Sequence, residues 1–334
     1  MKNTMRMLKI PISLTFLVKD IFIRNSSICN KTTKMEDFKD YMLCIVQKCK
    51  PSLAGDKYKG QAGRVGVVGG SFEYTGAPYF AGISALRVGA DLIHIFCALP
   101  AAPVIKSYSP ELIVHPVLDQ QNAINNIKPW LDRLHVIVIG PGLGRDPIVT
   151  DVVAELIDVL KKQKKPVVID ADGLFVITEQ PELLRGFSSP VILTPNKVEF
   201  ERLYNKLGGE SGLANLEENV LILRKGEPDE VIHKGTELRW KSYGGGSGRR
   251  CGGQGDLLSG TIAILLHWTL CNQDKIDIAT VTDKSMVAAT ISCYAACHLI
   301  RQCNKLAFKK LGRSMLASDM IEEIHNAFDE MFGE

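Results

Sequence analysis

The sequence predicts an α/β fold of three layers, in which helices cover both faces of a mostly parallel sheet. Short apolar runs such as Val136–Ile139 alternate with helical segments along most of the chain, and continuous β-branched runs are typical of parallel strands buried on both faces. Glycines and polar residues follow directly after one strand after another. The 334 residues contain no internal repeat and no linker after about residue 50, so we expect one domain over residues 40–332.

The composition is that of an ordinary globular protein. Hydrophobic residues make up 46% of the chain and charged residues 23%. A net charge of +3 without a basic stripe in the body argues against nucleic acid as a partner, and no apolar run is long enough to span a membrane. The nine cysteines form no C-x-x-C pair. We therefore expect reduced thiols in an intracellular protein rather than a zinc site or a disulfide framework.

Residues 1–34 differ in charge from the rest of the chain. They carry seven basic residues and one acid, Asp20, around a short apolar segment that Pro11 interrupts. A basic, acid-poor N-terminus of this kind is typical of a mitochondrial transit peptide. We expect mitochondrial targeting, and the alternative is a disordered extension on a cytoplasmic protein.

The predicted elements follow one another in a regular order. A strand from Gly63 runs into glycines, and a helix rich in small residues follows over residues 75–87. Further strands are expected at 91–96, 112–115, 136–139, 166–169, 191–193 and 218–223, with a hairpin of 230–233 and 237–240. Later helices are expected at 257–266, 285–301 and 318–328. His94 and His115 lie inside apolar strands, so we expect core histidines rather than catalytic ones.

The densest glycine loop, Gly244–Gly255, precedes an acid and an apolar helix. Glycines let the backbone bring its N–H groups close to a ligand, and a helix N-terminus is a natural anion site. Arg249 and Arg250 add positive charge suited to phosphate. Asp256, in the first turn of the helix, makes more sense as a base acting on the group that attacks the phosphate. The alternative is a flexible surface loop with a helix cap.

Other polar residues follow strands whose carboxyl ends should meet along one crevice. Asp170 and Asp172 suit a magnesium ion or helix capping. Asn196 and Glu199 lie one helical turn apart, where they can organise magnesium-bound waters or hydrogen-bond a substrate amide. Lys225 either contacts phosphates or is an exposed loop lysine. Neither a G-x-G-x-x-G fingerprint nor a Walker loop is present, and no metal ligand is firmly assigned. Together these parts favour phosphoryl transfer.

Four ordered motifs make the chain recognisable. Gly252–Gly260 resembles the Gly-x-Gly-Asp anion-hole signature of the ribokinase-like superfamily. With Gly140–Gly144, Ile169–Gly173 and Thr194–Phe200, it is similar to the NAD(P)H-hydrate dehydratase branch of that superfamily over roughly residues 40–332. Arg249–Asp256 is most similar to the eukaryotic, ATP-dependent form. The resemblance implies a three-layer ribokinase-like fold.

The resemblance also implies a reaction and its residues. ATP, as co-substrate with Mg²⁺ as cofactor, would phosphorylate the ring hydroxyl of the S-epimer of hydrated NADH or NADPH, with Asp256 as base. Loss of phosphate would regenerate NAD(P)H, a cofactor repair that would connect this protein with a separate epimerase; a homo-oligomer is possible. The hydrate would contact Gly144, Asn196, Lys197, Val198, Glu199, Phe200, Glu201, Arg202 and Asp256. ATP would contact Lys225, Gly226, Glu227, Pro228, Asp229, Gly246, Ser247, Gly248, Arg249, Arg250, Cys251, Gly252, Gly253, Gln254 and Gly255.

Two other functions fit the same residues. A thiazole or hydroxymethylpyrimidine kinase on this scaffold would release the phosphorylated alcohol instead of eliminating phosphate. A nucleotide-sensing protein without catalysis is the second alternative, and an intact Asp256 in a full anion loop argues against it. The choice of ATP over ADP rests on the resemblance alone.

Overall fold

The computed structural model describes residues 35–333 except for 56–57, 235–238, 243 and 277–282. The predicted targeting segment, 1–34, lies outside the described residues. So do residues 235–238, which form most of the turn and the start of the second strand in the hairpin predicted for 230–233 and 237–240.

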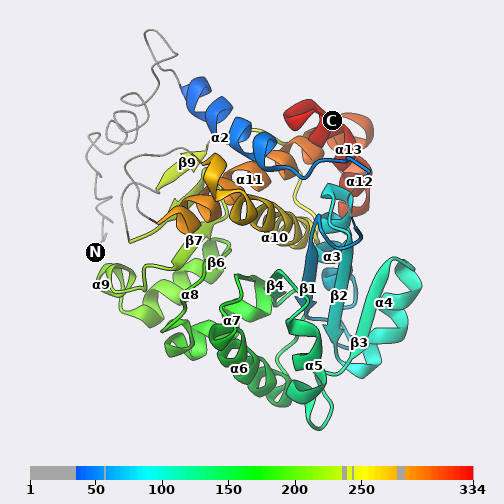
Figure 1. Ribbon diagram of the computed structural model, residues 1–334, viewed down its shortest axis with the longest axis vertical. Coiled ribbons are helices and arrows are strands. Elements are labelled where there is room, and N and C mark those ends of the chain that lie inside the picture. The colour runs from blue at the N-terminus through cyan, green and yellow to red at the C-terminus, as the bar shows by residue number, and fades with distance from the viewer. Residues whose placement is uncertain (1–34, 56–57, 235–238, 243, 277–282, 334) are drawn as a thin grey trace, which may run out of the picture.

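A single nine-stranded sheet runs through the described part of the chain (Figure 1), in the order β3-β2-β1-β4-β5-β6-β7-β8-β9. Its strands are β1 Arg64–Val68, β2 Leu92–Cys97, β3 Leu112–Pro116, β4 Val136–Ile139, β5 Val167–Ile169, β6 Val191–Leu193, β7 Val220–Arg224, β8 Asp229–Ile232 and β9 Trp240–Ser242. The pairings from β3 to β7 are parallel, whereas β8 and β9 are antiparallel additions at one edge. The predicted α/β class with a mostly parallel sheet is therefore confirmed.

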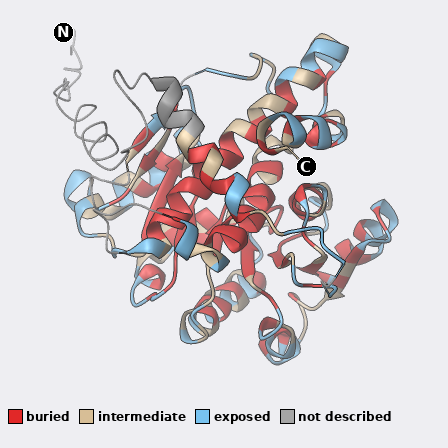
Figure 2. Ribbon diagram, turned by 45° about the horizontal axis from the view of Figure 1, so that its top comes forward, coloured by how far each residue is buried: buried red, intermediate tan, exposed pale blue. Residues whose placement is uncertain are grey.

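Helices cover both faces of the sheet. They are α2 Met35–Cys49, α3 Gly76–Val88, α4 Ala102–Tyr108, α5 Ala123–Leu131, α6 Pro147–Lys162, α7 Ala171–Glu179, α8 Lys197–Leu207, α9 Glu210–Ala214, α10 Gln254–Cys271, α11 Lys284–Leu311, α12 Ala317–Glu322 and α13 Ile324–Phe332, with 3₁₀ turns η1 Leu99–Ala101, η2 Pro181–Leu184, η4 Gln273–Lys275 and η5 Gly312–Ser314. Val136 and Val138 of β4 pack with α3, α10 and α11, whereas Ile137 and Ile139 pack with α5 to α8. Figure 2 shows the sheet and its flanking helices as the buried centre.

The order in which the chain adds strands to the sheet reverses between β1 and β4. From β1 the chain adds β2 and β3 on one side, and it then crosses back to place β4 on the other side of β1. In open α/β sheets such a reversal opens a crevice beyond the carboxyl ends of the strands. The loops after β1 and β4 therefore lie where this strand order predicts a crevice.

Helices α3 and α10 cross closely because Gly260 has no side chain. A Cβ atom at Gly260 would lie 1.9 Å from the carbonyl oxygen of Ala81 and 2.4 Å from Oγ of Ser84. All residues from Leu257 to Thr269 of α10 are buried, so the helix has little freedom to move aside. The position of the N-terminus of α10, where Asp256 lies, thus depends on this contact.

We expect Gly260→Ala to destabilise the fold by about 3 kcal/mol, because overpacking of a close backbone contact forces two helices apart. Thermal unfolding should show a melting temperature several degrees lower than that of the wild type. Gly55→Ala is the matched control, since a Cβ atom there meets nothing within 4 Å. Equal melting temperatures for both variants would show that α3 and α10 do not depend on Gly260.

The segment 318–328, predicted as one helix, forms two, so this prediction was wrong at Glu323. The chain bends there between α12 and α13, and Glu323 is 4% exposed. Its carboxylate accepts hydrogen bonds from Nζ of Lys310 at 2.5 Å and from Nδ2 of Asn326 at 3.0 Å. Lys310 comes from the last turn of α11, which extends ten residues beyond its predicted end at Arg301. A contact with the end of the preceding α-helix, α11, therefore supports the bend.

The prediction for the two strand histidines is confirmed. Nδ1 of His94 and Nε2 of His115 lie 2.9 Å apart, and the two rings stack. Burial lowers the pKa of both, and that of His115 falls to about 4. His94 is buried and His115 half-buried, and both are neutral near physiological pH.

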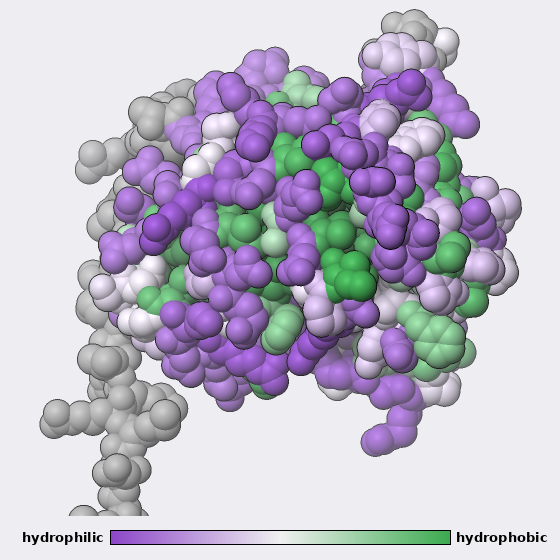
Figure 3. Space-filling view, turned by 90° about the horizontal axis from the view of Figure 1, so that it is seen from below, coloured by the Kyte–Doolittle hydropathy of each residue, from purple (hydrophilic) through white to green (hydrophobic). Residues whose placement is uncertain are grey.

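The face that Figure 3 shows is largely hydrophilic, with apolar side chains gathered in its middle. Within the described residues, no helix has the length and apolarity that crossing a membrane requires. The cysteines of the described part are free thiols, and Cys293 and Cys297 are buried. The expectation of buried, unpaired thiols is confirmed for those two.

Candidate active site

The N-terminus of α10 lies beside the loops that follow β5 and β7, since a Cβ atom on Gly255 would be 3.7 Å from Oδ2 of Asp170 and 3.3 Å from Nζ of Lys225. Its N-cap residue, Gly253, has φ +93° and provides no side-chain cap. A Cβ atom there would lie 2.7 Å from the ring of Phe80, so glycine is required both by the backbone angle and by the space. The uncapped N–H groups of the first turn and the helix dipole form an anion-binding site. Asp256 lies in that same turn.

A buried ion pair lies directly beside this turn. Nζ of Lys225 is 2.7 Å from Oδ1 of Asp170, whose side chain is 2% exposed. A Cβ atom on Gly255 would be 3.3 Å from Nζ of Lys225. The alternative that Lys225 is an exposed loop lysine is therefore wrong, because its ammonium group is held at the N-terminus of α10 by a carboxylate.

The surroundings of Asp256 shift its protonation. Burial and the negative charge of Asp170 together raise the pKa of this carboxyl to about 8, against the opposing influence of Lys225. Burial also raises the pKa of Glu199, again against the influence of Lys225. A carboxyl with a pKa near the working pH is suited to accept and return a proton.

Asn196 and Glu199 begin α8 as a capping box. Oδ1 of Asn196 accepts hydrogen bonds from the N–H groups of Val198 and Glu199, and Oε2 of Glu199 accepts one from the N–H of Asn196 at 2.8 Å. This arrangement fixes both side chains at the carboxyl end of β6. The amide nitrogen of Asn196 has no acceptor among the described residues and remains available to a ligand.

The other side chains of the predicted stretch 196–202 point in different directions. Phe200 is 9% exposed and packs in the core beneath α8, where the guanidinium carbon of Arg224 lies 5.1 Å from its ring centroid. Lys197, Glu201 and Arg202 are exposed, as is Val198. Consecutive residues of a helix face different directions, so a contiguous motif does not place all its side chains in one site.

The glycine loop after β4 packs tightly against the loop after β5. A Cβ atom on Gly140 would lie 1.8 Å from the carbonyl oxygen of Asp170. The N–H of Gly144 donates to Oδ2 of Asp172 at 3.0 Å, and Nε of Arg145 lies 3.5 Å from the other carboxylate oxygen. Asp172 therefore anchors the Gly144 loop at the β1–β4 switch point. Neither Asp170 nor Asp172 caps α7 through its side chain.

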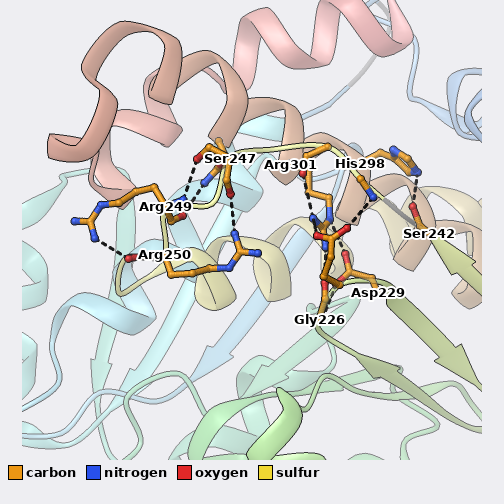
Figure 4. A network of polar contacts seen from close by, with 12 residues as sticks. Gly226, Asp229, Ser242, Ser247, Arg249, Arg250, His298 and Arg301 are labelled. Carbon is orange, nitrogen blue, oxygen red and sulfur yellow. Dashed lines mark hydrogen bonds and ion pairs between the residues drawn. The ribbon is translucent and has the colours of Figure 1, made fainter.

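The two stretches predicted to bind ATP lie side by side (Figure 4). Oε1 of Glu227 accepts a hydrogen bond from the N–H of Gly244 at 2.9 Å. Nη1 of Arg250 donates to the carbonyl oxygen of Ser247, and Nη1 of Arg249 donates to that of Arg250. Two arginines of the loop thus donate hydrogen bonds to backbone carbonyl groups of the same loop. The loop leads from the end of β9 to the N-terminus of α10.

The sequence reasoning missed residues of α11 that contact these loops. Arg301 bonds to the first stretch and Asn304 to the second, although both lie more than fifty residues further along the chain. A detectable signal existed, because His298, Arg301 and Asn304 recur every three residues directly after the largely apolar stretch that ends at Cys297. Their partners cannot be read from that spacing.

A metal ion would need ligands from outside the protein. Within the described residues, no group of three or more His, Cys, Asp or Glu side chains could hold a metal ion. Mg²⁺ commonly binds through one or two carboxylates, substrate phosphates and waters. The carboxylates beside the anion-binding turn fit that mode, not a closed protein cage.

Comparison with known proteins gives one consistent family. The family description "NAD(P)H-hydrate dehydratase" matches residues 65–326. The ATP-dependent (S)-NAD(P)H-hydrate dehydratase of Aedes aegypti is 49% identical over 308 residues, which are 91% of this chain and 89% of that protein. The enzyme of the same name from Homo sapiens is 47% identical over 324 residues, covering 94% and 90% of the two chains.

Solved structures agree on the fold. A ribokinase-like superfamily protein from Enterococcus faecalis has a TM-score of 0.64 at 19% identity, over 87% of this chain and 95% of that one. The ADP/ATP-dependent NAD(P)H-hydrate dehydratase from Bacillus subtilis, co-crystallised with ATP and Mg²⁺, has a TM-score of 0.59 at 23% identity, over 86% and 96%. The predicted ribokinase-like fold is confirmed.

Proposed function

Because this chain belongs to the NAD(P)H-hydrate dehydratase family, we propose that its crevice dehydrates the S-epimer of hydrated NADH or NADPH at the expense of ATP. The observation that carries the proposal is the position of Asp256. Its carboxyl lies in the open first turn of α10, beside the buried Lys225–Asp170 pair, and burial raises its pKa to about 8. The site therefore combines an anion-binding turn with a proton acceptor.

In this mechanism the carboxylate of Asp256 takes the proton from the ring hydroxyl. The hydroxyl oxygen forms a bond to the γ-phosphorus of ATP, and the bond to the ADP oxygen breaks. The N–H groups of the α10 turn and Lys225 stabilise the charge on the transferring group. Phosphate, a far better leaving group than hydroxide, then departs as the ring nitrogen donates its electron pair, and loss of a proton from the adjacent carbon restores the double bond.

The ligand contacts are part of the proposal. The amide nitrogen of Asn196 and the loop at Gly144 would face the hydrate, while Lys225 to Asp229 and Gly246 to Gly255 would bind ATP. Mg²⁺, when bound, would neutralise phosphate charge, and Glu199 would hold its waters. Phe200 is buried in the core and several side chains of α8 point to solvent. Fewer residues of the stretch 196–202 would therefore contact the hydrate directly than the whole motif contains.

The decisive test uses the S-epimer of hydrated NADH with the purified protein. Recovery of absorbance at the reduced-nicotinamide band should require ATP, and the same assay with ADP decides the nucleotide. A stable phosphorylated product without recovery would instead favour a hydroxyl kinase. No recovery with either nucleotide would contradict the proposal.

The rate should depend on pH through Asp256. Only the ionised carboxylate accepts a proton, so with a pKa of about 8 the kcat/KM for the hydrate should rise about tenfold per pH unit below that value and level off above it. Initial rates between pH 6 and 9 measure this dependence. A flat profile across that range would show that Asp256 does not act as the base.

Cellular context is proposed from the sequence. The basic, acid-poor residues 1–34 would direct the protein to mitochondria, and a separate epimerase would supply the S-epimer from the R-epimer. Fusion of residues 1–34 to a fluorescent reporter tests the first point, and a diffuse cytoplasmic signal would refute it.

A further inference from the structure

A row of polar side chains on α11 lies beneath the two loops proposed to bind ATP. His298, Arg301 and Asn304 are spaced three residues apart, so they share one face of the helix over successive turns. Nε2 of His298 lies 3.0 Å from Oγ of Ser242, at the end of β9 where the second loop begins (Figure 4). The row therefore follows the loop along its course.

Arg301 joins the first loop, residues 225–229, to the second loop, residues 244–253. Nε donates to Oδ2 of Asp229 at 2.8 Å, and Nη2 donates to the carbonyl oxygen of Gly226 at 2.6 Å. Nη1 donates at 3.2 Å both to Oε2 of Glu227 and to the carbonyl oxygen of Gly245. The side chain is 14% exposed. One planar guanidinium thus uses its fixed set of donors on four acceptors, which the single ammonium of a lysine cannot reproduce.

Asn304 holds the next part of the second loop. Its Oδ1 accepts a hydrogen bond from the N–H of Ser247 at 2.5 Å, and its Nδ2 donates to the carbonyl oxygen of Arg249 at 3.4 Å. The residue is 5% exposed. Both ends of this buried amide are therefore used on backbone groups of the loop.

The second loop needs such support because of its composition. Gly244, Gly245 and Gly246 have φ values of +77°, +87° and +74°, which glycine adopts freely but loses much chain entropy to maintain. The described part of this loop lies between β9 and α10 and belongs to neither element. A loop that had to be ordered at the moment of binding would weaken the affinity for its ligand.

We propose that Arg301 and Asn304 are positioning residues that hold the two loops in their nucleotide-binding arrangement. This inference rests on the proposed function, since it takes the ligand of the loops to be ATP. Neither side chain reaches the Asp256 turn through any contact described above. Their loss should therefore weaken nucleotide binding while the chemical step at saturating ATP continues.

The test compares Arg301→Lys and Asn304→Ala with the wild type. Calorimetric titration with ATP and Mg²⁺ should give a dissociation constant about 10- to 100-fold higher for each variant. The KM for ATP should rise in parallel, while the KM for the hydrate and kcat at saturating ATP stay within about threefold. Arg313→Gln is the control, because Arg313 is an exposed arginine in the short turn after α11, and its constants should equal those of the wild type.

Three results would overturn the inference. These are an unchanged affinity for ATP in both variants, an equal loss of kcat and of hydrate binding, and an effect of the same size in Arg313→Gln. Should Arg301→Lys fail to fold, Asn304→Ala decides alone, with its melting temperature as a check. The titration needs no turnover, so a wild type that binds ATP without restoring NADH refutes the proposed function and still tests the loops. A wild type that does not bind ATP refutes both.

Discussion

Asp256→Asn is expected to lower kcat by about 10³-fold while the dissociation constant for ATP changes no more than a few-fold. General-base catalysis typically contributes 10²- to 10⁴-fold, and asparagine preserves the shape of the side chain but cannot accept the proton. The anion-binding turn is made of backbone N–H groups, which the substitution leaves in place. Single-turnover rates with the S-hydrate and calorimetric titration with ATP measure the two effects separately.

The same substitution should stabilise the protein. The pKa of Asp256 rises from 3.8 to about 8 on folding, so the folded state holds a proton that the unfolded state has lost. Its contribution is fully present below the unfolded pKa and is lost as pH rises toward about 8. The melting temperature of Asp256→Asn should therefore exceed that of the wild type by an amount that grows between pH 5 and pH 8.

An exposed aspartate provides the control for both measurements. Asp158 is 54% exposed and pairs with Lys161 on the surface of α6, so Asp158→Asn should change neither turnover nor the pH dependence of melting. If Asp256→Asn kept both the affinity and the turnover of the wild type, Asp256 would not be the base. If it lowered stability at pH 8, the ionised carboxylate of Asp256 would not destabilise the fold as its raised pKa implies.

The fold was predictable where the signals are local. Val136–Ile139 reads as a buried parallel strand because four β-branched residues in a row suit a sheet covered on both faces. The bend at Glu323 was not predictable, because it depends on Lys310 of another helix. A periodic apolar pattern continues across the bend, and nothing in it marks Lys310 as a partner.

In the candidate site, too, features with a local sequence signal were predictable and contacts between separate elements were not. The turn at Asp256 could be located from glycine density and the apolar helix that follows it. The pairing of Lys225 with Asp170 joins residues 55 positions apart, and only the sheet order brings their strands close together. Phe200 shows where a contiguous motif misleads. The motif predicts that it contacts the hydrate, but the turn of the helix directs its side chain into the core.

Lys225→Met is expected to destabilise the protein by about 3–5 kcal/mol, the usual cost of removing one partner from a buried ion pair. Asp170 is 2% exposed and would keep its charge without a counterion, beside the carboxyls of Asp256 and Glu199. The variant should therefore melt several degrees lower than the wild type. Turnover should fall by about 10²-fold or more, since the ammonium beside Gly255 stabilises the transferring phosphoryl group.

Two further variants separate the charge effects from simple loss of a side chain. Lys225→Met combined with Asp170→Asn removes both charges, so most of the stability should return while turnover stays low. Lys206→Met removes the lysine of an exposed pair, 3.9 Å from Glu179, and should cost less than about 1 kcal/mol. If the double variant were no more stable than Lys225→Met, the loss would arise from packing and not from the buried carboxylate. If turnover returned with stability, Lys225 would serve only to neutralise Asp170, and the N–H groups of the α10 turn would have to carry the phosphoryl charge alone.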